Sequence, residues 1–459
     1  MNSHTLLTDK IIIVIICIST ALTITLTGCK KYLDAKPDLS LTTPSTLEDL
    51  QAVMDNDATM NTSYPSAAEI LSDDYYITND GFADITYNLY RDYYLWQKNT
   101  DTNIDWSAYG KVYYANVVLD NLSKIKYSSA QQAHWNAIKG SALFFRSFYF
   151  YALSQLFAPA YDLKGKNEGP GIPLRLSADF TIPSNRATLQ QNYDQMLEDL
   201  RTAVRLLPKD SPFKNRPTKP AAYGLIARIY LVMQEYKQAK VYADSCMQIS
   251  SELLDFNTLD SSHLSPIPAF NKEVIFNSRT LGAAPLGQSI WNADTLLLDT
   301  YAKGDLRKAM YFKQNPSEGF AFKGGYTGAS NGFAFTGIAT DEIYLIRAES
   351  SARLRDKEAA LTDLNILLSK RMKTENFSPL VYTNDELLLR RILEERRKEL
   401  VFRTLRWSDL RRLNIEGIYK TILRRNINGE IYELLPNQER YVLQIPINVI
   451  NHSGMMQNP

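Results

Sequence analysis

Apolar residues recur at helical spacing in eight windows along the chain. Positions i, i+3 and i+4 are apolar in one window after another, the pattern of a helix with one buried face. A short strand is indicated at residues 273–279. The pattern therefore predicts a mainly α-helical protein. The expected helices cover residues 107–126, 131–157, 189–207, 219–234, 237–250, 340–355, 357–371 and 384–404.

The expected helix over residues 131–157 is unusually aromatic. Between Phe144 and Leu153 seven of the ten positions are Phe, Tyr or Leu, so apolar side chains point in most directions. A helix that is apolar all round is buried on most sides. His134, Arg146 and Gln155 interrupt the run, which argues against a membrane span.

Small residues repeat at matching places in two helix pairs. Ala227 and Ala239 flank one turn, and Ala348 and Ala360 flank another with the same spacing. Small side chains let two helices approach closely where they cross, as in tetratricopeptide (TPR) pairs. Such pairs bury their faces only when they stack on neighbours. We therefore expect a TPR-like superhelix of about four units, built from the eight helices.

Residues 251–338 have a different composition. The segment is rich in Gly, Pro, Asn and Ser, and residues 319–337 alone hold six glycines and five aromatic residues. We interpret it as a loop-rich insertion, bearing short strands, between helices of about 107–250 and 340–404. Loops held by a rigid scaffold often carry function, so this region is the first place to look for a ligand.

The N-terminus has the features of an export signal. Residues 1–10 are polar and end in Lys10, and residues 11–26 form an apolar run of signal-peptide length. The following Leu26–Cys29 resembles the cleavage box of bacterial lipoproteins, in which the cysteine receives the acyl chains, palmitate among them. We expect a signal peptide at 1–28, lipid on Cys29, a polar tether at 29–45 and a domain at 46–459. An uncleaved anchor helix is the alternative.

The charge balance and the cysteine content restrict the classes of function that the chain can have. The 459 residues include 51 basic and 50 acidic side chains, a net charge of +1, which does not favour nucleic acid as a partner. Once Cys17 is removed with the signal and Cys29 carries lipid, Cys246 cannot form an internal disulfide. The four histidines lack metal-ligand spacing and there is no Cys-x-x-Cys, so no metal or cofactor is expected.

Two motifs could be read as catalytic. Residues 328–332 satisfy G-x-S-x-G around Ser330, with Asp341 and His452 downstream in hydrolase order. A nucleophile elbow needs an apolar strand before it and a helix after it, whereas these flanks are glycine-rich and aromatic. The acidic and basic run at 394–399 could hold a paired carboxylate. We expect instead a solvated helix face with i, i+4 ion pairs.

Ten short segments, spread over nearly the whole mature chain, match one known pattern. The most specific are Glu394–Leu400 and Arg406–Arg412. The others are Lys31–Asp34 after Cys29, Ile70–Tyr76, Gly140–Tyr149, Gly171–Leu174, Arg347–Glu349, Asp363–Asn365, Gln444–Ile447 and Met456–Pro459. Together they resemble the SusD/RagB outer-membrane lipoproteins of Bacteroidetes-type bacteria.

The resemblance implies a role as well as a fold. It implies a TPR-like scaffold, anchored in the outer membrane and facing the cell surface, that caps a SusC-type TonB-dependent β-barrel. The usual cargo of such proteins is a glycan, some relatives bind peptides, and no covalent chemistry is implied. There are two competing hypotheses. One is a lipid-anchored hydrolase, and the other is a purely protein-binding scaffold that would use the concave face of the TPR array.

Candidate ligand residues follow from how sugars are bound. A flat aromatic side chain contacts the apolar face of the ring, while amides, carboxylates or Arg bind the hydroxyl rim. Relatives bind ligand through loops in the regions 73–96 and 279–335, and both regions combine these groups. Trp291 and Tyr326 are the first choices because their neighbours are small or polar. The candidates are Asp73, Tyr75, Tyr76, Trp96, Arg279, Trp291, Asn292 and Tyr326.

Two aromatic positions carry more specific expectations. If residues 75 and 76 are extended, one of the two tyrosines points inward and the other outward. Trp407, which lies between Arg406 and Asp409 in a regular helical motif, is expected to belong to the core rather than to the ligand site.

Overall fold

The computed structural model describes residues 44–98, 100–280, 282, 290–315, 318–328, 333–417 and 419–459. Residues Thr46–Pro459 form one compact unit. The predicted signal peptide, Cys29, most of the predicted tether and Ser330 lie outside the described residues. No helix of the described part is both long enough and apolar enough to cross a bilayer.

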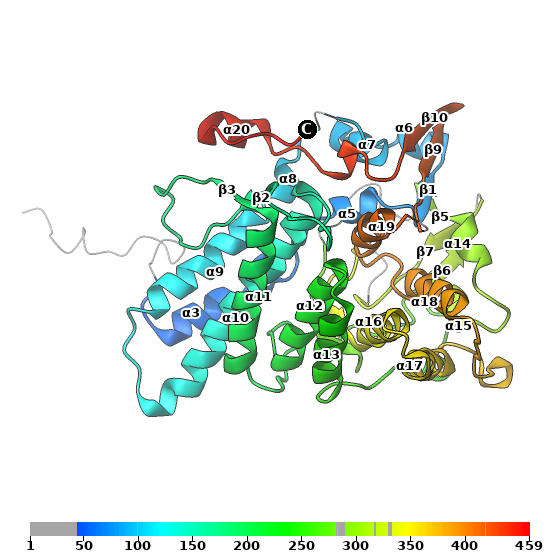
Figure 1. Ribbon diagram of the computed structural model, residues 1–459, viewed down its shortest axis with the longest axis horizontal. Coiled ribbons are helices and arrows are strands. Elements are labelled where there is room, and N and C mark those ends of the chain that lie inside the picture. Colours follow the sequence, from blue (N-terminus) through cyan, green and yellow to red (C-terminus); the bar gives the residue numbers. More distant parts are fainter. Residues whose placement is uncertain are drawn as a thin grey trace, which may run out of the picture. The chain divides into compact units, whose positions relative to one another are not determined.

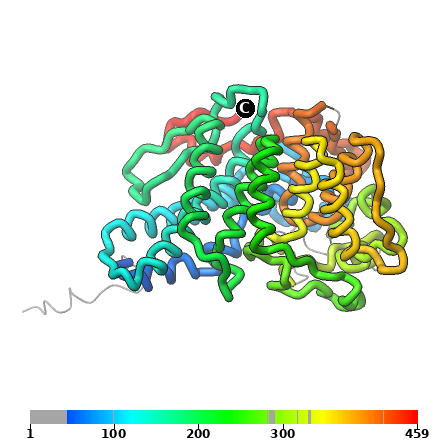
Figure 2. The backbone as a smooth tube through the Cα atoms, turned by 60° about the horizontal axis from the view of Figure 1, so that its bottom comes forward, coloured from blue at the N-terminus to red at the C-terminus, as the bar shows by residue number. Residues whose placement is uncertain are grey.

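All eight helices that the apolar periodicity predicts are present, and the fold is mainly α-helical with TPR-like pairs (Figure 1). Helices that follow one another in the chain pack on one another, and α16 continues the stack from α13. In Figure 2 they lie side by side in sequence order, from cyan through green to yellow and orange. The eight are α9 (Tyr109–Leu122), α10 (Gln132–Phe157), α11 (Leu189–Leu206), α12 (Lys219–Val232), α13 (Tyr236–Met247), α16 (Thr340–Arg353), α17 (Lys357–Ser369) and α18 (Asp385–Glu399).

Small residues lie where the paired helices meet. Ala227 and Ala239 in the α12–α13 pair, and Ala348 and Ala360 in the α16–α17 pair, are fully buried. A side chain on Gly224 would place its Cβ 2.7 Å from Ile338, so α12 approaches the neighbouring strand too closely for anything larger than glycine. The TPR-like interpretation of these positions is therefore confirmed.

The aromatic helix α10 is buried as its composition predicts. Every residue from Gly140 to Phe157 is buried. Two of its polar side chains have partners in other elements: Arg146 forms an ion pair with Asp199 of α11, and the Tyr149 hydroxyl donates to the Met60 carbonyl oxygen at 2.6 Å. A buried polar group without such partners would cost free energy.

The predicted helix over residues 384–404 is too long. Helix α18 ends at Glu399, and α19 (Arg406–Ile415) begins after a turn. Phe402 and Thr404 have left-handed φ angles of 56° and 59°, which end a right-handed helix. The Thr404 amide donates to the buried carboxylate of Glu69 at 2.7 Å, a contact that periodicity cannot show.

The expectation of a solvated face at residues 394–399 is wrong, although an i, i+4 ion pair is present between Glu394 and Lys398 at 3.6 Å. Glu395, Lys398 and Glu399 are at most 1% exposed. Arg307 donates to both glutamates, at 2.6 Å and 3.1 Å, and Arg371 donates to Glu399 at 2.7 Å. Charged residues are buried like this only when they are paired, and these partners lie far away in the sequence.

Short elements complete the unit, and the loop-rich insertion contains the expected strands. The strands pair two by two, β1 with β5, β2 with β3, β4 with β8, β6 with β7 and β9 with β10. The strands are β1 (Tyr75–Ile77), β2 (Pro170–Pro173), β3 (Arg186–Thr188), β4 (Val274–Phe276), β5 (Trp291–Ala293), β6 (Phe312–Gln314), β7 (Phe320–Phe322), β8 (Ile338–Ala339), β9 (Leu423–Ile427) and β10 (Glu430–Leu434). The remaining helices are α3 (Leu47–Met54), α4 (Asp57–Met60), α5 (Ala67–Ile70), α6 (Asn79–Ala83), α7 (Asn88–Tyr94), α8 (Asn103–Trp106), α14 (Thr295–Asp299), α15 (Leu306–Tyr311) and α20 (Ile447–Ser453), with 3₁₀ turns at Ser129–Gln131, Phe256–Thr258, Thr374–Asn376 and Glu439–Tyr441.

Candidate ligand-binding site

The two segments selected from the sequence meet in one β-ribbon. Strand β1 pairs antiparallel with β5, so that Tyr76 lies opposite Asn292 and Ile77 opposite Trp291. The structure thus brings together parts of the regions 73–96 and 279–335. Because alternate residues of a strand point to opposite faces, the ribbon has an inner and an outer face.

The two tyrosines of β1 divide between these faces, as expected. Tyr75 is 1% exposed, and its hydroxyl donates to the Ile70 carbonyl oxygen at 2.9 Å. Tyr76 is only partly buried and lies on the other face. Tyr75 is therefore a core residue, and Tyr76 is the aromatic side chain of β1 that a ligand can reach.

The expectation that Trp291 stacks on a ligand is wrong. Its side chain is 2% exposed and packs against Phe402, with ring centroids 4.6 Å apart, and against Tyr75 at 5.9 Å. Its small, polar neighbours suggested an open site. The ring instead joins an aromatic cluster supplied partly by the connection between α18 and α19, far away in the sequence.

Trp96 and Asn292 are buried as well. Trp96 is 2% exposed, and its indole N–H donates to the Leu71 carbonyl oxygen at 3.0 Å. Asn292 is 4% exposed, and its side-chain oxygen accepts from Asn315 at 2.5 Å. Asn292 therefore supports the outer face from beneath, while Trp96 belongs to the core.

Tyr326 is likewise a core residue, which contradicts its choice as a ligand contact. It is fully buried, its hydroxyl bonds to Glu273 and Asp341, and the Arg403 guanidinium carbon lies 3.9 Å from its ring centroid. Burial raises the pKa of its phenol well above the usual value. The small and polar neighbours of Tyr326 indicate an exposed loop, yet this ring packs over the buried ion pair of Arg403 and Asp341.

The carboxylate of Asp73, a predicted ligand contact, has hydrogen-bond partners within the protein. Arg406 binds both of its carboxylate oxygens, at 2.7 Å and 2.9 Å. Arg397 bonds to the Asp73 carbonyl oxygen at 2.7 Å and to the carboxylates of Asp74 and Asp294 at 3.0 Å. Burial favours the neutral acid, but Arg397 and Arg406 outweigh it and hold the pKa of Asp73 well below its usual range. This cluster fixes the loops that begin and end the ribbon.

The accessible part of the predicted site is the outer ribbon face, defined here as Tyr76, Asn315 and Glu318, with the buried Asn292 beneath them. Partial burial and the nearby Glu318 carboxylate raise the pKa of Tyr76. A flat phenol beside amide and carboxylate oxygens is the combination that sugar recognition requires. Arg279, which is half-buried, places its guanidinium carbon 5.3 Å from the Phe333 ring centroid.

The two described residues of the possible hydrolase triad, Asp341 and His452, do not pair with each other. Ser330 lies outside the described residues. Asp341 is fully buried and binds Arg403 through both carboxylate oxygens, at 3.0 Å and 2.6 Å. His452 is exposed on α20 and bonds to the Asn448 carbonyl oxygen at 2.6 Å. The acid–histidine pair that a triad needs is absent, because both residues have other partners.

The fold is a TPR-like helical scaffold with inserted loops, and Tyr76 faces outward from its β1–β5 ribbon. Two family models match the sequence. One, described as starch-binding and associating with the outer membrane, covers residues 31–231, and the SusD family model covers residues 338–459. The chain belongs to the SusD/RagB family. Among curated proteins, no sequence matches it.

Solved structures share the fold over nearly their whole length. A putative sugar binding protein from Bacteroides vulgatus is 21% identical with a TM-score of 0.75, covering 91% of this chain and 99% of its own. A SusD superfamily protein from Bacteroides thetaiotaomicron is 21% identical with a TM-score of 0.72, covering 90% and 100%. Another from Bacteroides vulgatus is 22% identical with a TM-score of 0.74, covering 90% and 99%.

Proposed function

We propose that this chain is a lipoprotein on the surface of the outer membrane that binds a nutrient glycan and delivers it to a SusC-type TonB-dependent β-barrel. The observation that carries the ligand class is the outer ribbon face, where a tyrosine ring lies beside amide and carboxylate oxygens. Membership of the SusD/RagB family and the description of one matching model as starch-binding support the same ligand class.

The ribbon is well suited to hold its outer face in place. Tyr75 and Trp291 anchor the inner face in the core, and Arg397 ties together the loops on which Asp73 and Asp294 lie. A recognition side chain on a rigid support loses little conformational entropy on binding. In this proposal Tyr76 contacts the apolar face of a sugar ring, and Asn315 and Glu318 bind hydroxyl groups.

Tyr76→Ala is expected to weaken the binding of the cognate neutral oligosaccharide about tenfold, which is about 1.4 kcal/mol, because it removes the ring without opening the core. Calorimetry with a panel that includes maltoheptaose measures the change. Tyr87→Ala is the matched control, since Tyr87 is a 67% exposed tyrosine outside the ribbon. If Tyr76→Ala and wild type bind the oligosaccharide with equal affinity, Tyr76 is not part of the ligand site. If the protein binds peptides and no sugars, the proposed ligand class is wrong.

Cys29→Ala is expected to release the protein from the outer-membrane fraction. Without the thiol there is no lipid attachment, and stable anchoring depends on several acyl chains. Immunoblots of soluble and membrane fractions measure the effect. Cys17→Ala is the control, because this residue lies inside the apolar run of the signal. Unchanged partition of the Cys29→Ala protein would show that something other than lipid holds it.

A further inference from the structure

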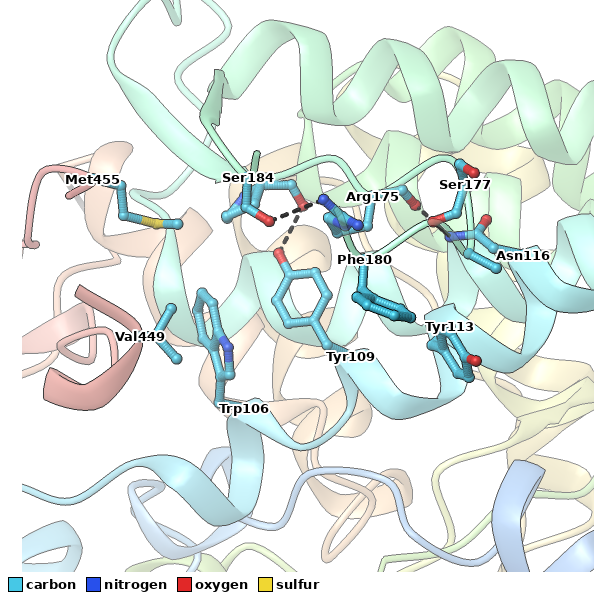
Figure 3. A pocket seen from close by; sticks show the side chains of 12 residues that line it. Trp106, Tyr109, Tyr113, Asn116, Arg175, Ser177, Phe180, Ser184, Val449 and Met455 are labelled. Atoms are coloured by element: carbon cyan, nitrogen blue, oxygen red, sulfur yellow. Dashed lines mark hydrogen bonds between the residues drawn. The ribbon is translucent and has the colours of Figure 1, made fainter. Parts of the chain in front are cut away.

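A groove lined by aromatic side chains lies outside both segments predicted from the sequence. It runs between α8–α9 and the loop 174–185, encloses about 320 Å³, and is closed at one end by Val449 and Met455 (Figure 3). Three of its aromatic residues, Trp106, Tyr109 and Tyr113, come from one stretch of chain, and Phe180 lies at the tip of the loop.

The rings form a row along the helix. The centroids of Trp106 and Tyr109 are 4.8 Å apart. Tyr113 follows Tyr109 by four residues, which places it about 6 Å further along the same side of α9. Tyr113 is 46% exposed and Phe180 85% exposed. Exposed aromatic residues gathered around one hollow indicate a surface that another molecule covers.

Buried hydrogen bonds hold the loop wall against α9. Asn116 is fully buried and donates to the Arg175 and Ser177 carbonyl oxygens, at 2.8 Å and 3.3 Å. Its own side-chain oxygen accepts from Arg146 at 3.0 Å. Asp120 accepts from the Ala178 amide at 2.8 Å. The base of the loop that carries Phe180 is therefore fixed before any ligand arrives.

The groove offers little to a charged ligand. Arg175 is the one side chain in its lining with a permanent charge. Its guanidinium donates to the carbonyl oxygens of Ile182 and Asp179, both at 2.5 Å, and to the Ser184 hydroxyl at 3.1 Å. The Arg175 cation therefore has its partners within the loop, whereas the rings of the lining and the exposed Tyr113 hydroxyl suit a neutral ligand with apolar faces and a polar rim.

A second hollow continues the groove past Met455. It encloses about 400 Å³, and Met455 lines both spaces. Its Arg186 is also engaged, since it donates to the carbonyl oxygens of Gly171, Met456 and Pro170 at 2.7–3.0 Å. Together the two hollows offer more space than one sugar ring requires.

We infer that this groove is a second saccharide site, which binds a neutral, linear oligosaccharide along α9 with its rings against Trp106, Tyr109, Tyr113 and Phe180. The inference rests on the proposed function, because it adds a site for the same class of ligand. The row of rings favours a chain of several sugars over a single one, since each further ring contact adds to the binding free energy.

The test is the double variant Tyr113→Ala/Phe180→Ala. Both side chains are exposed, so the fold is expected to survive their removal. Tyr114→Ala is the matched control, because Tyr114 is 42% exposed on the same helix but does not line the groove. Calorimetry compares neutral oligosaccharides from starch, xylan and mannan with the matching monosaccharides and with an oligogalacturonide.

We expect two sites in the wild type. In the double variant one of them should bind the neutral oligosaccharide at least tenfold more weakly, while Tyr114→Ala binds like wild type and the monosaccharide binds more weakly than the chain. If the double variant binds the neutral oligosaccharide like wild type while Tyr76→Ala binds it more weakly, the groove is not a saccharide site and the proposed function stands. If the groove binds the anionic oligogalacturonide as tightly as the neutral oligosaccharides, the inference that its ligand is neutral is wrong. No binding of any saccharide by the wild type overturns both proposals.

Discussion

Replacing Arg228 with methionine is expected to destabilise the protein by about 3–5 kcal/mol. Arg228 on α12 donates to both carboxylate oxygens of Glu342 on α16, at 2.7 Å and 2.6 Å. The two side chains are 2% and 1% exposed. The substitution leaves the Glu342 charge in the core without its guanidinium partner, and a buried charge without a partner is costly.

A double-mutant cycle separates this cost from the net value of the pair. Arg228→Met/Glu342→Leu removes both charges, so it is expected to be far less destabilised than Arg228→Met alone. The surface control is Arg390→Met, because Arg390 and its partner Glu386 are 51% and 59% exposed and solvent screens such pairs strongly. Urea unfolding monitors these variants together with Glu342→Leu, the second single variant of the cycle. A double variant as unstable as the sum of its single variants would contradict the explanation.

Trp407→Ala is expected to destabilise the protein by about 3–5 kcal/mol, the usual cost of removing a large buried side chain. Trp407 is fully buried, and its ring stacks on Tyr441 with centroids 4.7 Å apart. Its indole N–H has no hydrogen-bond partner within the described residues. The loss should therefore come from packing rather than from a broken hydrogen bond.

Thermal unfolding measures this effect, and Trp407→Phe is the comparison that keeps an aromatic ring in the cavity. We expect Trp407→Phe to lose less stability than Trp407→Ala, since it leaves a smaller void. An unchanged melting temperature of Trp407→Ala would mean that the side chain is exposed in solution and available to a ligand.

The location of the helices could be predicted because each of them keeps an apolar face toward its neighbours. Seven of the eight predicted helices agree with the structure to within a few residues at each end. The eighth predicted helix, over residues 384–404, includes Phe402 and Thr404, whereas α18 ends at Glu399. There the chain adopts left-handed φ angles without glycine, and the Glu69 carboxylate that binds the Thr404 amide comes from the far N-terminal part of the domain.

The segments of the candidate site could also be predicted, but not which of their residues are exposed. The same signal, an aromatic residue among small or polar neighbours, occurs at Trp291 and at Phe180. Trp291 is 2% exposed and Phe180 is 85% exposed. Local sequence cannot separate them, because Phe402 buries Trp291 from another part of the chain while nothing within the described residues covers Phe180 to that extent.

The sequence alone determined the helical scaffold, the place of its loop-rich insertion and the family resemblance, because these depend on periodicity and on short motifs along the chain. The tertiary structure decided which charges of the 394–399 run are buried, which face of the β1–β5 ribbon is open and where the aromatic groove forms. Burial and ion pairing are properties of contacts between distant residues such as Arg307 and Glu395, and such contacts exist only once the helices have packed.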